Sequence, residues 1–95
     1  MALARVVQFE GVSPERIESL RQQMESDEGP PPEVPAVELM LLHDPDQQTA
    51  VAILFFDSEE DYRRGDETLS AMPSDETPGR RTSVSKYTVA VRRSV

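Results

Sequence analysis

The fold is decided by AVELMLLHDPDQQTAVAILFF, residues 36–56. Residues 36–43 and 49–56 are the two most apolar stretches of the chain, and Asp44, Pro45 and Asp46 between them are typical turn residues. We therefore predict that the two stretches form the strands of an antiparallel hairpin.

Both faces of this hairpin are predicted to be apolar. Alternate positions hold Leu39, Leu41, Ile53 and Phe55, and the intervening positions hold Met40, Leu42, Leu54 and Phe56. Successive side chains of a strand point to opposite faces. The two helices predicted below can cover only one face of the sheet. A large uncovered apolar face is unusual in a soluble monomer. We therefore expect a homodimer in which two copies pack through this sheet face.

A strand and a helix are predicted before the hairpin. Residues 3–10 are rich in Val and Phe and are followed by Gly11, which favours a strand. Ser13 is a suitable N-cap and Pro14 suits the first helical position. Apolar residues then recur at spacings of three and four, which predicts a helix over residues 14–25. The proline-rich residues 26–35 are predicted to be a loop.

A second helix is predicted directly after the hairpin. Ser58 is a suitable N-cap, and the acidic residues 59–61 lie where the helix dipole favours negative charge. The inner face of this helix would carry Tyr62, Leu69 and Met72. Gly65 lies between them and would allow the helix backbone to approach the sheet closely. Pro73 is expected to end the helix.

A last strand completes the predicted fold. Residues 82–92 alternate and are rich in Val, Thr and Tyr. The order of elements is then βαββαβ, the ferredoxin-like arrangement. We predict a single α+β domain over residues 1–95, with a four-stranded antiparallel sheet and two helices on one face. Two such domains would form a dimeric α+β barrel.

The composition indicates a globular protein, with 37% hydrophobic and 29% charged residues. The chain has no cysteine, which excludes disulfides, thiolate metal sites and thiol nucleophiles. No apolar run approaches the length of a membrane span, and the first ten residues do not resemble a signal peptide. We expect a cytoplasmic protein that does not bind membranes.

The charge of the chain is unevenly distributed. The formal net charge is −8, with +5 in residues 80–95 and −13 in residues 1–79. Such a negative surface repels nucleic acid, and the basic segment has no aromatic platform beyond Tyr87. We expect no nucleic-acid binding, and we expect the basic strand to offset the acidic helices beside it. A regulator that binds an anionic partner through this strand is an alternative.

The segment FFDSEEDY, residues 55–62, together with the element order and the two-faced hairpin, resembles the dimeric α+β barrel superfamily. It is most similar to the antibiotic-biosynthesis-monooxygenase-like branch, in which the third strand ends in aromatics and the next helix starts with Ser and acids. The resemblance extends over residues 4–92. It implies a ligand cavity between the sheet and the helices of each protomer.

The resemblance also implies a range of activities. Members include cofactor-independent oxygenases of polycyclic phenols, haem-degrading enzymes, isomerases, decarboxylases and barrels without known activity. The oxygenases rely on Trp and Asn with Tyr and Arg, and the haem-degrading enzymes on Asn, Trp and a helical His. This chain contains no Trp and no Asn, so neither set can be carried over to its residues.

Two residues are candidates for proton transfer. His43 is the only histidine and lies beside Asp44 at the turn of the hairpin. It is either a structural or surface residue or a general base or lone ligand, and its surroundings match no metal-ligand spacing. Tyr62 either packs in the core or donates a hydrogen bond to a ligand through its phenol. We predict no metal site and no cofactor.

Five further residues are candidates for contact with a small hydrophobic ligand: Met40, Phe55, Phe56, Met72 and Tyr87. Their ordinary role is core packing, and their alternative role is to line a pocket. Two functions follow. One is a cofactor-independent oxygenase or related enzyme that acts on a small hydrophobic or aromatic metabolite. The other is a non-catalytic ligand-binding or assembly module of the same fold.

Overall fold

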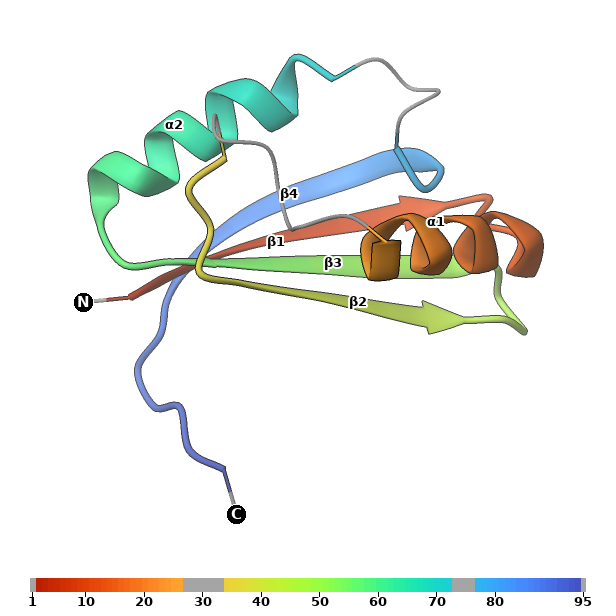
Figure 1. Cartoon of the computed structure of the whole chain (residues 1–95), viewed down its shortest axis with the longest axis horizontal. Helices are drawn as coiled ribbons and strands as arrows, with labels where there is room; N and C mark the ends of the chain where they lie inside the picture. Colours follow the sequence, from red (N-terminus) through yellow and green to blue (C-terminus); the bar gives the residue numbers. More distant parts are fainter. Residues whose placement is uncertain (1, 27–33, 73–76, 95) are drawn as a thin grey trace.

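The computed structural model describes residues 2–26, 34–72 and 77–94 of the chain. Within these residues the elements are, in order, β1 (Leu3–Glu10), α1 (Pro14–Ser26), β2 (Glu38–Asp44), β3 (Thr49–Phe56), α2 (Glu59–Ser70) and β4 (Arg80–Thr88), as Figure 1 shows. The predicted α+β class and the predicted βαββαβ order are confirmed. Most of the predicted loop over residues 26–35 and the predicted helix end at Pro73 lie outside the described residues.

The four strands form one antiparallel sheet in the order β2-β3-β1-β4. This order is consistent with a ferredoxin-like fold, in which the first and third strands occupy the centre. β1 pairs with β3 along its whole length, from Leu3 opposite Phe56 to Glu10 opposite Thr49. The predicted hairpin of β2 and β3 is confirmed, with Glu38 opposite Phe55 and Asp44 opposite Thr49.

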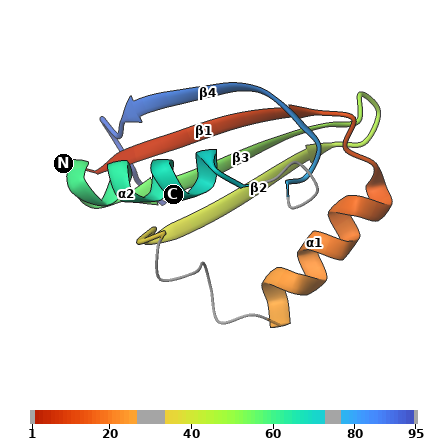
Figure 2. The same cartoon turned by 90° about the horizontal axis from the view of Figure 1, so that it is seen from above.

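Both helices lie on one side of this sheet, and Figure 2 shows α2 running alongside the strands while α1 is inclined away from them. Residues opposite each other in an antiparallel pair share a face. Leu3, Val7 and Phe9 of β1 therefore share the helix-covered face with Phe56, Ala52 and Ala50 of β3. The prediction of two helices on one face is confirmed.

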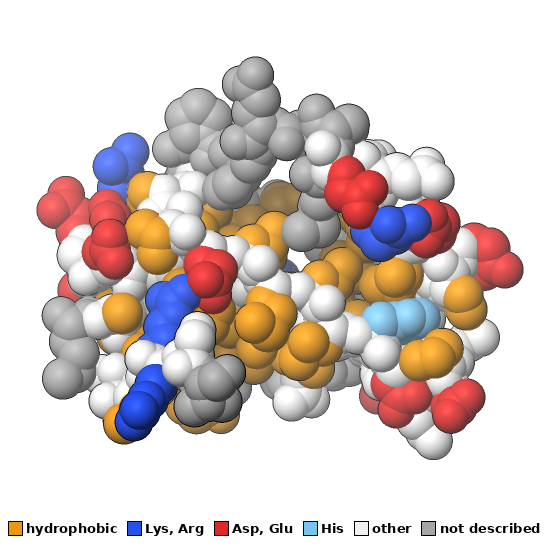
Figure 3. Space-filling model, turned by 60° about the horizontal axis from the view of Figure 1, so that its bottom comes forward, with side chains coloured by type: hydrophobic (Ala, Val, Ile, Leu, Met, Phe, Trp, Pro, Cys, Tyr) orange, Lys and Arg blue, Asp and Glu red, His pale blue; other side chains and the backbone are white. Residues whose placement is uncertain are grey.

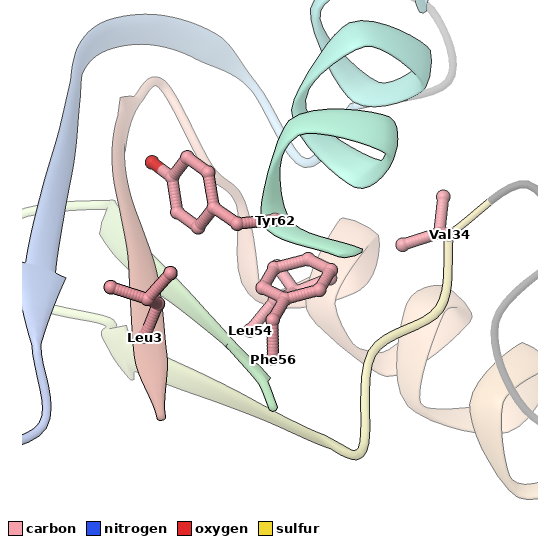
Figure 4. Packing of buried hydrophobic residues seen from close by; sticks show 5 residues of the cluster. All are labelled: Leu3, Val34, Leu54, Phe56 and Tyr62. Atoms are coloured by element: carbon pink, nitrogen blue, oxygen red, sulfur yellow. The ribbon is translucent and has the colours of Figure 1, made fainter. Parts of the chain in front are cut away.

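The core under α2 is a cluster of Leu3, Val34, Leu54, Phe56 and Tyr62 (Figure 4). Tyr62 comes from α2 and meets the Phe56 ring edge-on, with 5.5 Å between the ring centroids. A second cluster lies under α1, and Ile17 of that helix packs against it: Val7, Phe9, Val12 and Ala50. The core is thus divided into two parts, one for each helix.

The helix starts follow the predicted caps. The Ser13 hydroxyl accepts a hydrogen bond from the Arg16 amide at 3.1 Å, and the Ser58 hydroxyl accepts one from the Asp61 amide at 3.2 Å. Both satisfy an amide that has no partner within its helix. Among the described residues, no helix is long and apolar enough to cross a lipid bilayer.

The last strand differs from the prediction. β4 begins at Arg80 and ends at Thr88, whereas the alternating pattern predicted residues 82–92. Its neighbour among the described strands, β1, begins at Leu3 opposite Thr88. A bond from the Val89 amide to the Ala2 carbonyl, 2.9 Å long, is the last one the pair makes beyond the strands. The alternating pattern continues over residues 89–92, but the strand ends at Thr88, opposite the first residue of β1.

The face of the sheet opposite the helices, here called the open face, is apolar over the hairpin, as predicted, and carries Gln8, Ser83 and Ser85 on β1 and β4. It carries exposed side chains of Met40, Leu42 and Tyr87, which are 42%, 48% and 57% exposed. Between them lie the half-buried side chains of Ile53 and Phe55. Arg92 lies over the Phe55 ring with 4.4 Å between its guanidinium carbon and the ring centroid. The two apolar faces of the hairpin are confirmed.

Candidate functional site

The candidate site is a cavity of about 420 Å³ between the sheet and the two helices. Its floor comes from β1, β2 and β3 and consists of Val7, Phe9, Leu39, Leu41, Ala52 and Leu54. Leu20 of α1 lines it, as do Leu69 and Met72 at and beyond the end of α2. In the space-filling view of Figure 3, hydrophobic side chains surround a hollow near the middle of the molecule. The lining is therefore almost wholly apolar.

The cavity has a structural origin in the sheet and in α1. The middle of β3 provides small side chains, because Ala50 and Ala52 occupy two successive positions on the helix-covered face. α1 is inclined away from the sheet in Figure 2 and contacts the second core cluster through Ile17. Short side chains below and a splayed helix above leave a space that a closely packed core would fill.

Arg5 is the buried charged residue of the cavity wall. Its side chain is 3% exposed, although it lies in the middle of β1. Its Nε donates to Asp66 Oδ1 at 2.9 Å, and its Nη2 donates to Ser70 Oγ at 3.4 Å. Both partners belong to α2, so the arginine ties the centre of the sheet to the helix above it.

Arg5 was not among the predicted site residues, although the sequence holds a signal for it. Residues 3, 5, 7 and 9 share one face of β1, and three of them are apolar and buried. An arginine at the remaining position must therefore be buried with these residues, unless the strand is distorted so that its side chain reaches the solvent. Strand alternation alone would have identified it as a buried charge.

Of the five predicted ligand-contact residues, Met72 lines the cavity. Phe56 lies in the core cluster under α2 and is fully buried. Met40, Phe55 and Tyr87 lie on the open face, on the other side of the sheet. The structure does not bring these five residues together in one site.

His43 lies at the end of β2 and is half-buried. Its Nε2 lies 3.2 Å from the Val12 carbonyl oxygen. A carbonyl can only accept, so this bond places the imidazole proton on Nε2. This hydrogen bond links the turn after β1 to the hairpin. It does not involve the second ring nitrogen, Nδ1.

Tyr62 lies at the other end of the sheet. His43 is opposite Ala50, and Tyr62 packs against Phe56, six residues further along β3. At 3.3 Å per residue, these two points of β3 are roughly 20 Å apart. The two predicted proton-transfer residues therefore do not share one site, and neither is among the described residues that line the cavity.

The surroundings of Tyr62 hold its phenol in the neutral form. The side chain is 7% exposed, and Lys86 Nζ lies 5.0 Å from its ring centroid. Burial raises the pKa of the Tyr62 phenol, and the nearby Asp66 carboxylate raises it further. The cations Arg5 and Lys86 lower the pKa, but the net effect of the surroundings raises it and opposes the phenolate.

The basic segment near the end of the chain pairs with acids from three other elements. Arg80 pairs with Glu10 of β1, Lys86 with Glu59 of α2, and Arg92 with Glu38 of β2. The expectation that the basic strand offsets neighbouring acids is confirmed at Lys86 and Glu59. Exposed pairs of this kind contribute little to stability individually. In the part of the chain that the structure describes, no three His, Asp or Glu side chains gather to hold a metal ion.

No family model matches this sequence. A search of curated proteins also gives no match.

Proposed function

We propose that this chain is a binding protein for a small hydrophobic molecule, which it holds between its sheet and its helices. The observation that supports this function is the cavity of about 420 Å³ with its apolar lining. Ligand pockets in proteins have volumes of roughly 300–1,000 Å³ and are mostly apolar with a few polar groups. The cavity meets both conditions, and Arg5 supplies a polar group in its wall.

A binding function is favoured over catalysis by the groups around the cavity. General acid–base chemistry needs a titratable group within hydrogen-bond reach of the reacting atoms. The described lining residues include two arginines and two threonines as polar groups, and no carboxylate, histidine or tyrosine. A cofactor-independent oxygenase, which the family resemblance implies, is the second candidate. Oxygen uptake in the presence of a polycyclic phenol would support it.

We further propose that two copies form a dimeric α+β barrel through their open faces. Ile53 and Phe55 with Met40 and Leu42 make an apolar surface that neither helix covers. A two-fold pairing of sheet on sheet would remove this surface from water without another chain. Light scattering at micromolar concentration tests the proposal: a mass of about twice 10.6 kDa is expected, and a folded monomer contradicts it.

The binding proposal is tested by filling the cavity. Ala52→Phe places a ring into the space from the floor. Because the ring enters empty space, the variant is expected to keep or raise the Tm of the wild type and to lose binding of decanol, a neutral apolar probe. Ligand stabilisation of the Tm is the readout, since a ligand that binds only the folded state raises it.

Ala71→Phe is the matched control. Ala71 is exposed at the end of α2 and is not among the lining residues, so the same ring is added outside the cavity. This variant is expected to bind decanol like the wild type. The binding proposal is wrong if neither the wild type nor the control is stabilised by decanol, or if Ala52→Phe is stabilised as strongly as they are.

A further inference from the structure

We propose that the ligand of the cavity is a hydrophobic monocarboxylate, and that its carboxylate is bound by Arg5. This inference rests on the proposed binding function and names the class of ligand. Its basis is Arg5, a buried arginine among the residues that line the apolar cavity, whose guanidinium makes two hydrogen bonds with the described residues.

The partner of Arg5 compensates its charge incompletely. The Asp66 side chain is 40% exposed, whereas that of Arg5 is 3% exposed. The two meet through one contact, from Nε to Oδ1, instead of the two parallel bonds that arginine and carboxylate form in their strongest arrangement. The carboxylate is thus partly solvated, whereas the arginine side chain lies in the interior. A buried cation in this position is stabilised by a further anion.

Arg5 also has donors to spare. A guanidinium has five N–H groups. With the described residues, Arg5 makes two hydrogen bonds, from Nε to Asp66 and from Nη2 to Ser70, and the second is long at 3.4 Å. The remaining donors, including both of Nη1, can serve a ligand. A carboxylate has the acceptor geometry that fits them.

The charge around the cavity has the sign that this ligand needs. The two charged residues among the described lining are Arg5 and Arg81, and both are positive. The chain as a whole carries −8. A positive site in an acidic protein selects an anion locally, because the apolar walls screen the charge poorly. The apolar lining in turn requires that the rest of the ligand be hydrophobic.

The experiment compares two probes of equal chain length, decanoate and decanol, at pH 8. The wild type is expected to bind decanoate roughly 10- to 150-fold more tightly than decanol, because a hydrogen bond to a charged group contributes about 1.5–3 kcal/mol. Arg5→Met is expected to abolish this preference and to keep binding of decanol. Both dissociation constants are measured by titration calorimetry.

Arg63→Met is the control for net charge. Arg63 is exposed on α2 and is not among the lining residues, so the substitution removes the same charge outside the cavity. It is expected to retain the preference for decanoate. An equal loss of preference in both variants contradicts the proposal, because the effect would then be one of overall charge.

Asp66→Asn provides a second test that keeps Arg5 in place. It decides whether Arg5 binds the carboxylate if Arg5→Met does not fold. Removal of the competing carboxylate leaves the guanidinium without an anion, so the ratio of decanoate to decanol affinity is expected to rise at least threefold. An unchanged or lower ratio overturns the role of Arg5. If decanol binds and decanoate shows no advantage in the wild type, this inference fails alone. If decanol does not bind to the wild type, the proposed function fails with it.

Discussion

Gly65 of α2 lies directly against the ring of Phe56 on β3. A Cβ atom at Gly65 would lie 2.6 Å from Cε1 and 2.7 Å from Cζ of that ring. Phe56 is fully buried, so its ring has no free space to move into. The prediction that this glycine lets the helix approach the sheet closely is confirmed, and the contact fixes the height of α2 above the sheet.

Gly65→Ala is expected to lower the free energy of unfolding by about 1–3 kcal/mol, as overpacking of a core does. This loss of stability is expected although alanine is favoured over glycine in a helix by about 1 kcal/mol. Arg64→Ala, on the exposed side of the same helix, is expected to change it by less than about 0.5 kcal/mol. Urea denaturation measures both. A more stable Gly65→Ala would mean that the helix can shift away from Phe56 without cost.

Ser58→Ala is expected to lower the free energy of unfolding by about 1 kcal/mol, because the Asp61 amide loses the hydroxyl that accepts its hydrogen bond. Ser58→Asp restores an acceptor and is expected to recover most of the loss. The two variants are compared by urea denaturation. Equal stabilities for Ser58→Ala and the wild type would show that water replaces the cap.

The adjacent residues Phe55 and Phe56 are expected to respond differently to aspartate. Phe55→Asp should keep the fold but give a monomer, because its side chain lies on the open face. Phe56→Asp should unfold the protein, with a loss of about 4 kcal/mol or more, because it places an unpaired charge in the core. Circular dichroism and light scattering separate the two outcomes. A dimer that survives Phe55→Asp argues against pairing through the open face.

The raised pKa of Tyr62 predicts a loss of stability at high pH. The phenol has a higher pKa in the folded protein than in the unfolded chain, where it is about 10. The unfolded chain therefore releases its proton first, so the contribution to stability is complete below pH 10 and is lost as pH rises through the folded pKa. Tyr62→Phe keeps the aromatic ring and removes the ionisable hydroxyl group. Urea denaturation between pH 8 and 11 should show a smaller loss for the variant than for the wild type.

The elements that depend on local signals were predictable. The caps at Ser13 and Ser58 and the turn after His43 act within a few residues, and β1 and β3 have the predicted bounds. The end of β4 was not predictable, since a strand ends where its neighbour ends and the pattern of residues 89–92 holds no sign of that. Of the candidate site, the sequence provided Met72 alone.

The sequence by itself determined the order of the elements and the apolar character of both faces of the hairpin, because residue spacing and helix caps depend on residues that are close in the sequence. Only the tertiary structure decided that Phe56 enters the core while Phe55 faces outward. Both faces of the strand carry apolar side chains there, so the alternation of the sequence does not show which face is buried. It also decided that Arg5 lines a cavity. That placement depends on Asp66 and Ser70, more than sixty residues away, and on the distance at which α2 packs against the sheet.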